Sequence, residues 1–530
     1  MKPSPKPDAA VTLIVAAAAS AALLALAMPG RIGWWPLLFV ALAPLLLTAL
    51  YARPGRSALG GFVFGLLYHL ALLYWIMIVL GRYGGLPVWI TLPALFLLAA
   101  YMACFPAVFC FLLSSLAGRF WHRERSIAPL VWGAPVLWVG LDFLRSVLFS
   151  GFPWMDLGYG LFSQPKLIQA ADIGGHHLLT FSLVLCNGLV VAIIDRQRRD
   201  VHWNIRRERR LLLAAVAFLA FVVGYSVVRH RVVGAIVARS MQARVAVVQG
   251  NIDQAIKWSP TTKAATVETY LKLSRQAAGE ADTELVVWPE TALPFYPQQD
   301  ALIGRVNEFT ATSNTWLLTG APLYSLPPQA DGGQQVRYYN GAVLIGPDGR
   351  IGGQRAKQHL VPFGEYVPLR RFLPFLEPLV VSVGDFSVGV DKGPLALGPM
   401  RLGVLICYES IFPDIAHESV IRGANLLVNI TNDAWYGRSS APYQSMAMAV
   451  LRAVENKRTL IRAANTGISG FVDPLGRIVA RSEIFTEAAL VSQAPMLELT
   501  TVFNRNGHRF GAACAFCIPL LLLFRSRREA

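Results

Sequence analysis

Long apolar runs fill most of the first 228 residues of the chain and recur once near its end, with short polar connections between them. A helix needs about 20 consecutive apolar residues to cross the hydrocarbon core of a bilayer. Eight stretches approach this length, and each predicts a membrane-spanning helix. They lie near residues 9–28, 34–51, 58–80, 87–117, 128–148, 178–194, 211–228 and 508–524.

The first of these stretches also has features of a secretory signal peptide. Lys2 and Lys6 precede it, and it ends in the sequence ALAMPG. Its apolar part is longer than the roughly 7 to 15 residues usual in such a peptide, which favours a membrane span. A cleaved signal is the alternative.

Positive charge collects in every second connection between the predicted spans. The other connections carry little more than Arg31, Arg82 and Lys166. Because basic connections stay on the cytoplasmic side of a membrane, both termini are predicted to be cytoplasmic and residues 229–507 to lie outside. The clusters follow spans two, four, six and eight and comprise Arg53, Arg56, Arg119, Arg123, Arg125, Arg196, Arg198, Arg199, Arg206, Arg207, Arg209, Arg210, Arg525, Arg527 and Arg528.

The fifth connection, residues 150–177, has the external parity and is rich in aromatic residues, Gly and Pro. Trp154 and Tyr159 suit the depth of the lipid headgroups, so we expect them to anchor this segment at the interface, with substrate contact as the alternative. Asp142 and Arg145 lie three residues apart near the end of span five, and we expect them to pair on one helix face.

The polar region between spans seven and eight alternates strand-like apolar runs with helical patterns. This alternation predicts an α/β layered sandwich, and no Gly, Ser or Pro-rich linker divides it into two domains. A long helix is expected from Tyr443 to Ala464, and residues 468–483 are expected to close the domain with a turn at residues 473–476. Strands are expected at 243–250, 283–290, 315–323, 340–351, 402–406 and 424–433, with further helices at 261–279 and 410–423.

The composition agrees with a membrane protein that carries a folded polar domain. Of the 530 residues, 54% are hydrophobic and only 15% are charged, and the mean hydropathy is +0.46. The net charge of +16 falls largely in the arginine clusters beside apolar runs, so it is a topology signal and predicts no nucleic-acid partner. The predicted division is a transmembrane domain over 1–228, an external catalytic domain over 229–507, and a final helix with a cytoplasmic tail over 508–530.

Cys407 is the one cysteine of the polar region, because the other five lie within hydrophobic runs. It follows the short apolar run from Leu402 to Ile406 and precedes a helical pattern, so the thiol is expected on a strand-to-helix turn. Such turns present a nucleophile to backbone N–H donors. The alternative is that Cys407 only packs in the core, as many cysteines do.

Glu290 and Lys357 also follow strand-like segments, and sites in layered α/β folds gather where strands end. With Cys407 they would form a coherent set. Glu290 would take the thiol proton, and Lys357 with the backbone N–H of Tyr408 would stabilise the oxyanion. Taken singly, Glu290 and Lys357 are more often solvated surface residues.

The motifs WPE, K-x-H-L-V-P-F-G-E-Y-V-P and CYE, in this order behind seven predicted spans, closely resemble those of the apolipoprotein N-acyltransferase family, membrane-embedded members of the nitrilase superfamily. The resemblance covers essentially the whole chain. It implies an αββα sandwich and a Glu-Lys-Cys triad at Glu290, Lys357 and Cys407.

The same resemblance implies that Glu365 is a second acid supporting the site and that Trp258, Tyr408, Glu409 and Trp435 line or gate it. One departure stands out. Family members often carry a His shortly after the NDAW segment, where this chain has Gln444 and Ser445. No role for a histidine can be carried over to that place.

The implied reaction is a ping-pong transfer, the last step of bacterial lipoprotein maturation. Cys407 would take an acyl chain from a phospholipid as a thioester and pass it to the α-amine of a diacylglyceryl-cysteine on an apolipoprotein. The implied location is the bacterial inner membrane, with the catalytic domain on the periplasmic side. The alternatives are a membrane-tethered nitrilase-type amidohydrolase, with water as acceptor, and a non-enzymatic lipid carrier.

No cofactor or metal is expected. The histidines of the polar region lack the spacing of metal ligands, no Gly-rich phosphate loop is present, and thioester chemistry needs no nucleotide. These histidines are His230, His359, His417 and His508.

Overall fold

The computed structural model describes residues 9–198, 205–254, 257, 259–279, 282–327, 336–366 and 386–523. The chain divides into two compact units. The helical unit comprises Met1–Tyr74, Leu92–His230 and Asn506–Ala530, and the α/β unit comprises Trp75–Thr91 and Arg231–Arg505. The segment Trp75–Thr91 therefore groups with the α/β unit, although it includes the end of the predicted span 58–80 and the start of the predicted span 87–117.

Apolar helices make up the helical unit. Within the described residues, five helices are long and apolar enough to cross a membrane: Ala10–Ala27, Val88–Trp121, Pro129–Ser150, Ile168–Gln197 and Ile205–Val237. Each of the eight predicted spans overlaps a helix, but the others are shorter or less apolar, so the count of eight is not confirmed. The elements are α1 (Ala9–Ala27), η1 (Trp35–Phe39), α2 (Ala43–Tyr51), α3 (Pro54–Leu72), α4 (Val88–Leu116), α5 (Ala134–Val147), α6 (Ala171–Arg198), α7 (Ile205–Val237) and α13 (Arg509–Leu523).

Small residues let helices approach closely in this unit. A Cβ on Gly61 of α3 would lie 2.3 Å from the carbonyl oxygen of Pro106 in α4, so only glycine fits there. Apolar helices in lipid gain most of their association energy from such close packing.

The predicted pair of Asp142 and Arg145 is confirmed at 3.2 Å. The prediction for Trp154 and Tyr159 is wrong, because both side chains are fully buried within the helical unit. Trp154 stacks on Phe152, and the ring of Tyr159 stacks on His176 with centroids 4.5 Å apart. Aromatic composition alone could not distinguish an interfacial anchor from a packed core residue.

Two sheets form the centre of the α/β unit. Over the described residues, the first has six strands in the order β12-β1-β2-β3-β4-β5 and the second has six in the order β11-β10-β9-β8-β7-β6. The first contains β1 (Gln242–Gln249), β2 (Leu285–Val287), β3 (Trp316–Ser325), β4 (Arg337–Ile345), β5 (Ile351–Ala356) and β12 (Ala488–Pro495). The second contains β6 (Leu395–Leu397), β7 (Met400–Ile406), β8 (Leu426–Thr431), β9 (Thr459–Ala464), β10 (Gly470–Val472) and β11 (Ile478–Arg481).

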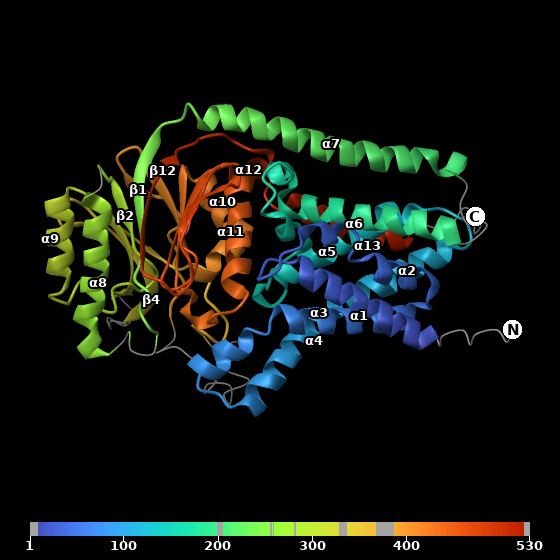
Figure 1. Ribbon diagram of the computed structural model, residues 1–530, viewed down its shortest axis with the longest axis horizontal. Helices are drawn as coiled ribbons and strands as arrows, with labels where there is room; N and C mark the ends of the chain where they lie inside the picture. Colours follow the sequence, from blue (N-terminus) through green and yellow to red (C-terminus); the bar gives the residue numbers. More distant parts are fainter. Residues whose placement is uncertain are drawn as a thin grey trace. The chain divides into compact units, whose positions relative to one another are not determined.

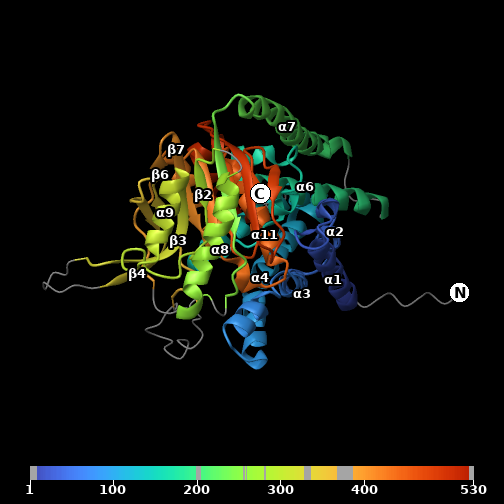
Figure 2. The ribbon, with the colours of Figure 1, turned by 60° about the vertical axis from the view of Figure 1, so that its left-hand side comes forward.

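The layer order is helix, sheet, sheet, helix. Alternate residues of β1 point to opposite faces: Val245 and Val247 pack toward the second sheet, and Ala246 and Val248 pack toward the helices. Helices α8 (Pro260–Gly279) and α9 (Ile303–Ser313) cover the first sheet, and α10 (Pro413–Ile421) and α11 (Ala441–Asn456) cover the second (Figure 1). Figure 2 shows α8 and α9 from another side. The predicted αββα sandwich is confirmed.

The predicted long helix from Tyr443 to Ala464 is wrong in its second half. Helix α11 ends at Asn456, where Lys457 has a positive φ of 51°. Residues Thr459–Ala464 instead form β9, which pairs in parallel with β8. Burial between two neighbouring strands overrides the helical pattern of these residues.

The prediction also omitted the last strand of the domain. The expected turn at residues 473–476 connects β10 to β11, but the domain continues to β12. This strand pairs antiparallel with β1, from Gln242 opposite Pro495 to Gln249 opposite Ala488. It therefore closes the edge of the first sheet.

Candidate active site

Cys407 lies directly after β7, at the first residue of the short helix η9 (Cys407–Ile411). Its φ is +56°, a left-handed conformation that a residue with a Cβ adopts at a cost on the order of 1–3 kcal/mol. The Asn429 side chain on β8 donates to the Leu405 carbonyl at 2.9 Å and to the Cys407 carbonyl at 3.4 Å. These bonds fix the backbone on both sides of the turn that presents the thiol.

Glu290 follows β2, and its carboxylate is buried. Oε1 accepts from the Asn340 side chain at 2.8 Å, and Oε2 accepts from the Asn432 backbone N–H at 2.9 Å. A Cβ at position 320 of β3 would lie 2.6 Å from the Glu290 Cα, so Gly320 is required for this turn to pack on the sheet.

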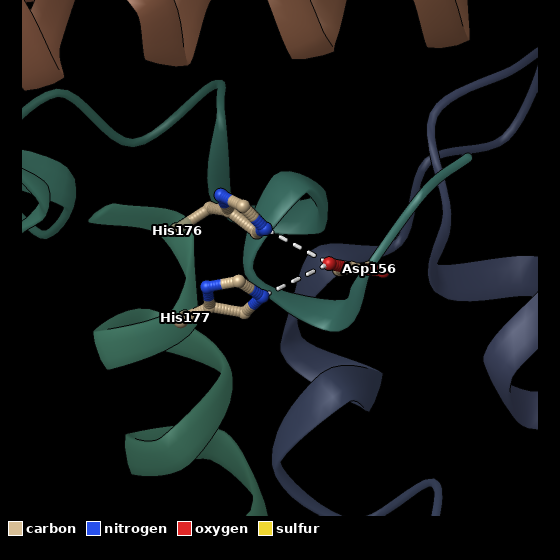
Figure 3. A group of neighbouring side chains, drawn as sticks. All are labelled: Asp156, His176 and His177. Atoms are coloured by element: carbon tan, nitrogen blue, oxygen red, sulfur yellow. Dashed lines mark hydrogen bonds and ion pairs between the residues drawn. The ribbon is translucent and has the colours of Figure 1, made fainter. Parts of the chain in front are cut away.

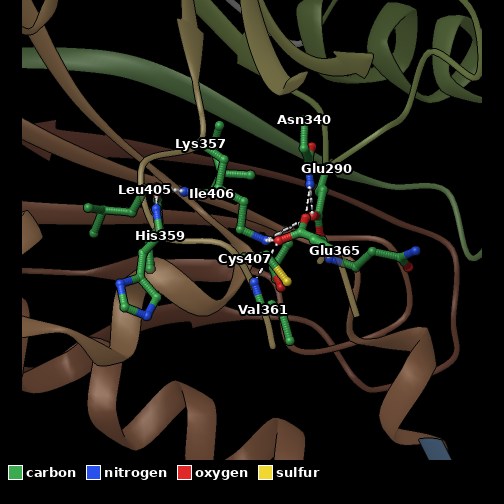
Figure 4. A network of polar contacts seen from close by, with 12 residues as sticks. Glu290, Asn340, Lys357, His359, Val361, Glu365, Leu405, Ile406 and Cys407 are labelled. Atoms are coloured by element: carbon green, nitrogen blue, oxygen red, sulfur yellow. Dashed lines mark hydrogen bonds and ion pairs between the residues drawn. The ribbon is translucent and has the colours of Figure 1, made fainter. Parts of the chain in front are cut away.

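Lys357 follows β5, and its side chain is 1% exposed. Nζ lies 2.8 Å from Glu365 Oε2 and 3.9 Å from Glu290 Oε1. Asn340 joins the two acids, because its side-chain nitrogen donates at 2.8 Å to each of them. Figure 4 shows Glu290, Lys357, Glu365 and Cys407 directed toward one another. The structure thus brings together three residues that the sequence places up to 117 positions apart.

The electrostatics of the site keep the thiol protonated at rest. Burial raises the pKa of Cys407, the negative charge of Glu290 raises it further, and Lys357 acts in the opposite direction. Burial alone would lower the pKa of Lys357, but Glu365, Cys407 and Glu290 together raise it above its ordinary value. A thiol that is protonated and hydrogen-bonded to Glu290 needs a base to become a nucleophile.

Glu409 ties the segment after Lys357 to the Cys407 turn. Its carboxylate accepts from the backbone N–H groups of Gln358 at 2.5 Å, His359 at 3.0 Å and Ile406 at 2.7 Å. Burial raises its pKa to about 7, against the effect of these donors and of Lys357. Its contacts are those of a residue that positions the turn.

Aromatic residues predicted to line the site have different surroundings. Tyr408 is buried and packs on Phe412, with ring centroids 5.0 Å apart. Trp435 lies in η10 (Asp433–Tyr436) and packs edge-on against Tyr83 of η2 (Ile78–Tyr83), with centroids 5.7 Å apart. Trp258 lies outside the described residues.

The segment that departs from the family pattern begins α11. The Gln444 side chain donates to Ser440 at 3.1 Å, and Ser445 accepts from the Arg462 guanidinium at 3.0 Å. Ser445 therefore belongs to a buried polar network around Arg462, which also includes Asn429 and, at 2.9 Å, Asp433.

Sequence reasoning missed Asn340, Asn429, Asn432 and Arg462. Each lies in or beside an otherwise apolar strand. An asparagine or arginine at such a place is weak evidence of a functional site, because many such side chains are simply exposed to solvent. A polar residue inside an apolar strand needs a buried partner, and that requirement is the only sequence signal that could have pointed to them.

Arg462→Met should unfold the α/β unit at a markedly lower temperature. Arg462 and Asp433 are both fully buried, so the substitution leaves an uncompensated carboxylate, which costs about 3–5 kcal/mol. Arg422→Met is the matched control, because its ion pair with Glu418 is half exposed and worth roughly 0–1 kcal/mol. Thermal unfolding of both purified variants tests this expectation, and equal midpoints would contradict it.

One group of three possible metal ligands occurs among the described residues, in the helical unit. It consists of Asp156, His176 and His177 (Figure 3). Asp156 Oδ2 lies 2.8 Å from His176 Nε2 and 3.7 Å from His177 Nε2, while Oδ1 accepts from the Arg145 guanidinium. A divalent ion would have to displace these bonds beside a guanidinium that repels it. The arrangement suits an ion-pair network that ties the connection after α5 to α6.

Comparison with known proteins covers both units. Residues 20–189 match the family model of the apolipoprotein N-acyltransferase N-terminal domain, and residues 244–499 match that of the carbon-nitrogen hydrolases. A solved amidase from Nesterenkonia sp. is 21% identical, with a TM-score of 0.34, and covers 48% of this chain and 92% of its own.

Two curated relatives extend over nearly the full length. The apolipoprotein N-acyltransferase of Geobacter metallireducens is 39% identical over 514 residues, which are 96% of this chain and 95% of the relative. That of Azotobacter vinelandii is 35% identical over 504 residues, which are 94% of this chain and 92% of the relative. Similarity of this degree across both units shows that the chain belongs to the apolipoprotein N-acyltransferase family.

Proposed function

We propose that this protein transfers an acyl chain from a membrane phospholipid to the N-terminal amine of a diacylglyceryl-cysteine on an apolipoprotein. The main support for this proposal is that the Cys407 thiol, the Glu290 carboxylate and the Lys357 ammonium lie close together. They do so in a chain that belongs to this family. The apolar helices support it further, because an acyl donor that resides in a bilayer requires an enzyme held at the membrane.

The first half-reaction acylates Cys407. Glu290 takes the thiol proton as the sulfur attacks the ester carbonyl carbon of the phospholipid. Lys357 stabilises the negative charge on the former carbonyl oxygen, and the backbone N–H of Tyr408 is proposed as a second donor. The carbon–oxygen bond then breaks, Glu290 returns the proton to the departing oxygen, and lysophospholipid leaves behind a thioester.

The second half-reaction uses the same groups with an amine as nucleophile. The α-amine of the acceptor attacks the thioester carbonyl carbon, and Glu290 takes the proton that the amine loses. The carbon–sulfur bond breaks, the thiolate of Cys407 receives the proton, and the product is an amide. Glu365 acts through Lys357, which it holds at 2.8 Å, and is proposed as a supporting acid.

The proposal includes a location and the remaining site residues. We assign the protein to the bacterial inner membrane with the α/β unit on the periplasmic side, on the strength of the arginine distribution. Glu409 is proposed to position the Cys407 turn, and Tyr408, Trp435 and Trp258 to line the site. The domain limits at residues 228 and 507 are part of the same proposal.

The acyl-enzyme should distinguish transfer from hydrolysis. After incubation with phospholipid, the purified protein should carry one acyl chain and keep it, because a transferase must shield its thioester from water until an amine arrives. A diacylglyceryl-cysteine peptide with a free α-amine should discharge it, and the N-acetylated peptide should not, since its nitrogen is no longer nucleophilic. Intact-mass spectrometry follows both reactions. Rapid discharge to free fatty acid, unaffected by either peptide, would support the amidohydrolase alternative instead.

A further inference from the structure

Lys257 is a second buried lysine beside the candidate site, and the mechanism above gives it no role. Its side chain is 1% exposed, as is that of Lys357. Nζ donates to the backbone carbonyl of Glu290 at 3.2 Å. Burying a lysine costs desolvation free energy. Only nearby negative charges or hydrogen-bond acceptors that interact with the ammonium can offset that cost.

The acidic side chains of Glu290 and Glu365 are nearby groups that can offset this cost. Asn340 bridges Glu290 and Glu365, so two carboxylates share one amide group. Lys357 lies against Glu365 at 2.8 Å but is 3.9 Å from Glu290. With Lys357 alone, two carboxylates would face one cation. With the ammonium of Lys257, two lysines face the two acidic side chains, and a nearby opposite charge offsets the repulsion between the two acids.

The ammonium of Lys257 also faces the negative charge that develops at Cys407 during the reaction. When the thiol proton moves to Glu290, a negative charge appears on sulfur and then on the substrate oxygen. The titratable groups that act on Lys257 are Glu290, from the turn after β2, and Cys407, from η9. Lys357 and Glu365 complete the charged surroundings of the thiol. Lys257 therefore lies beside the two groups, Glu290 and Cys407, whose charges change during the reaction.

We propose, on the basis of the acyl transfer proposed above, that Lys257 is a positioning residue for acylation of Cys407. It holds the Glu290 backbone by its hydrogen bond, and its positive charge offsets the negative charge that develops at Cys407. It neither gives nor takes a proton in the reaction. The proton passes from the thiol to Glu290 and from there to the lysophospholipid oxygen.

This role predicts a specific pH dependence. Burial lowers the pKa of Lys257 to about 8, although the negative charges of Glu290 and Cys407 act to raise it. Lys257 is therefore largely charged below pH 8 and loses its charge as the pH rises above that value. The rate of acylation should fall with it. The acylation step must be measured alone, without acceptor, because the acceptor α-amine titrates near the same pH.

The experiment compares Lys257→Met and Lys257→Arg with the full-length enzyme in single-turnover acylation by phospholipid, followed by intact mass from pH 6 to 10. Lys257→Met should acylate about 10 to 100-fold more slowly at pH 7, the effect of losing a hydrogen bond from a charged donor. It should also lack the decline near pH 8. Lys257→Arg keeps its charge at every pH used, so it should retain most of the rate and decline only at higher pH.

The control is Lys263→Met, which removes a partly exposed lysine of α8 and should leave both rate and pH profile unchanged. Unaltered acylation in Lys257→Met would overturn the inference. So would an equal loss in the Met and Arg variants with the decline still near pH 8, which is the result of a purely structural role. If Lys257→Met does not fold, the pH profile of Lys257→Arg decides alone. Absence of acylation in the unmodified enzyme would instead refute the proposed function.

Discussion

Cys407→Ala should abolish acyl-enzyme formation and acyl transfer together. The loss of a nucleophile that forms a covalent intermediate reduces turnover by about 10⁶-fold, because the remaining groups have nothing to activate. Incubation with phospholipid should then leave the mass of the protein unchanged. In the unmodified protein, the added acyl chain should be released by hydroxylamine, as expected of a thioester.

The control for this experiment is Cys104→Ala, which removes an exposed cysteine of α4. It should acylate at the normal rate and to the same extent of one chain per protein. An acyl adduct that persists in Cys407→Ala, or one that disappears in Cys104→Ala, would assign the thioester to another residue. Full function in the cell after Cys407→Ala, with no acyl-enzyme formed, would support the non-enzymatic lipid carrier.

Much of the fold followed from residue patterns, because strand and helix periodicities are local. Apolar runs such as Leu402 to Ile406 predicted a buried strand that ends at Cys407, and this is confirmed. The predictions from residue patterns were wrong or incomplete where a segment's structure depends on contacts with residues far away in the sequence. Residues Thr459–Ala464 continue a helical pattern, yet their position beside β8 makes them a strand. Nothing local predicts β12, which exists as a partner of β1.

The candidate site shows the same division. Glu290, Lys357 and Cys407 could be named because each follows a strand within a distinctive motif, and the structure brings them together. Asn340 could not, since its importance lies in donating to two acids that are 75 positions apart in the sequence. Lys257 was likewise invisible, because a lysine in a polar segment is normally solvated. Burial is what distinguishes it, and burial is a property of the folded chain.

Lys357→Met should reduce the rate of acylation by about 100 to 1,000-fold, the usual effect of removing one donor to a developing oxyanion. The same substitution leaves Glu365 buried without its cation, which by itself destabilises a protein. The two effects are separated by the double variant Lys357→Met with Glu365→Gln, in which both charges are removed. Thermal unfolding should recover in the double variant toward that of the unmodified protein.

The acylation rate should not recover, because the oxyanion still lacks its cation. Lys392→Met, which removes a half-exposed lysine paired with Glu418, is the matched control and should acylate normally. A double variant that regains the rate along with the stability would show that Lys357 only balances Glu365. A persistent loss of at least about 100-fold in a double variant of normal stability, with a smaller loss in Glu365→Gln alone, is the result that assigns Lys357 to the transition state.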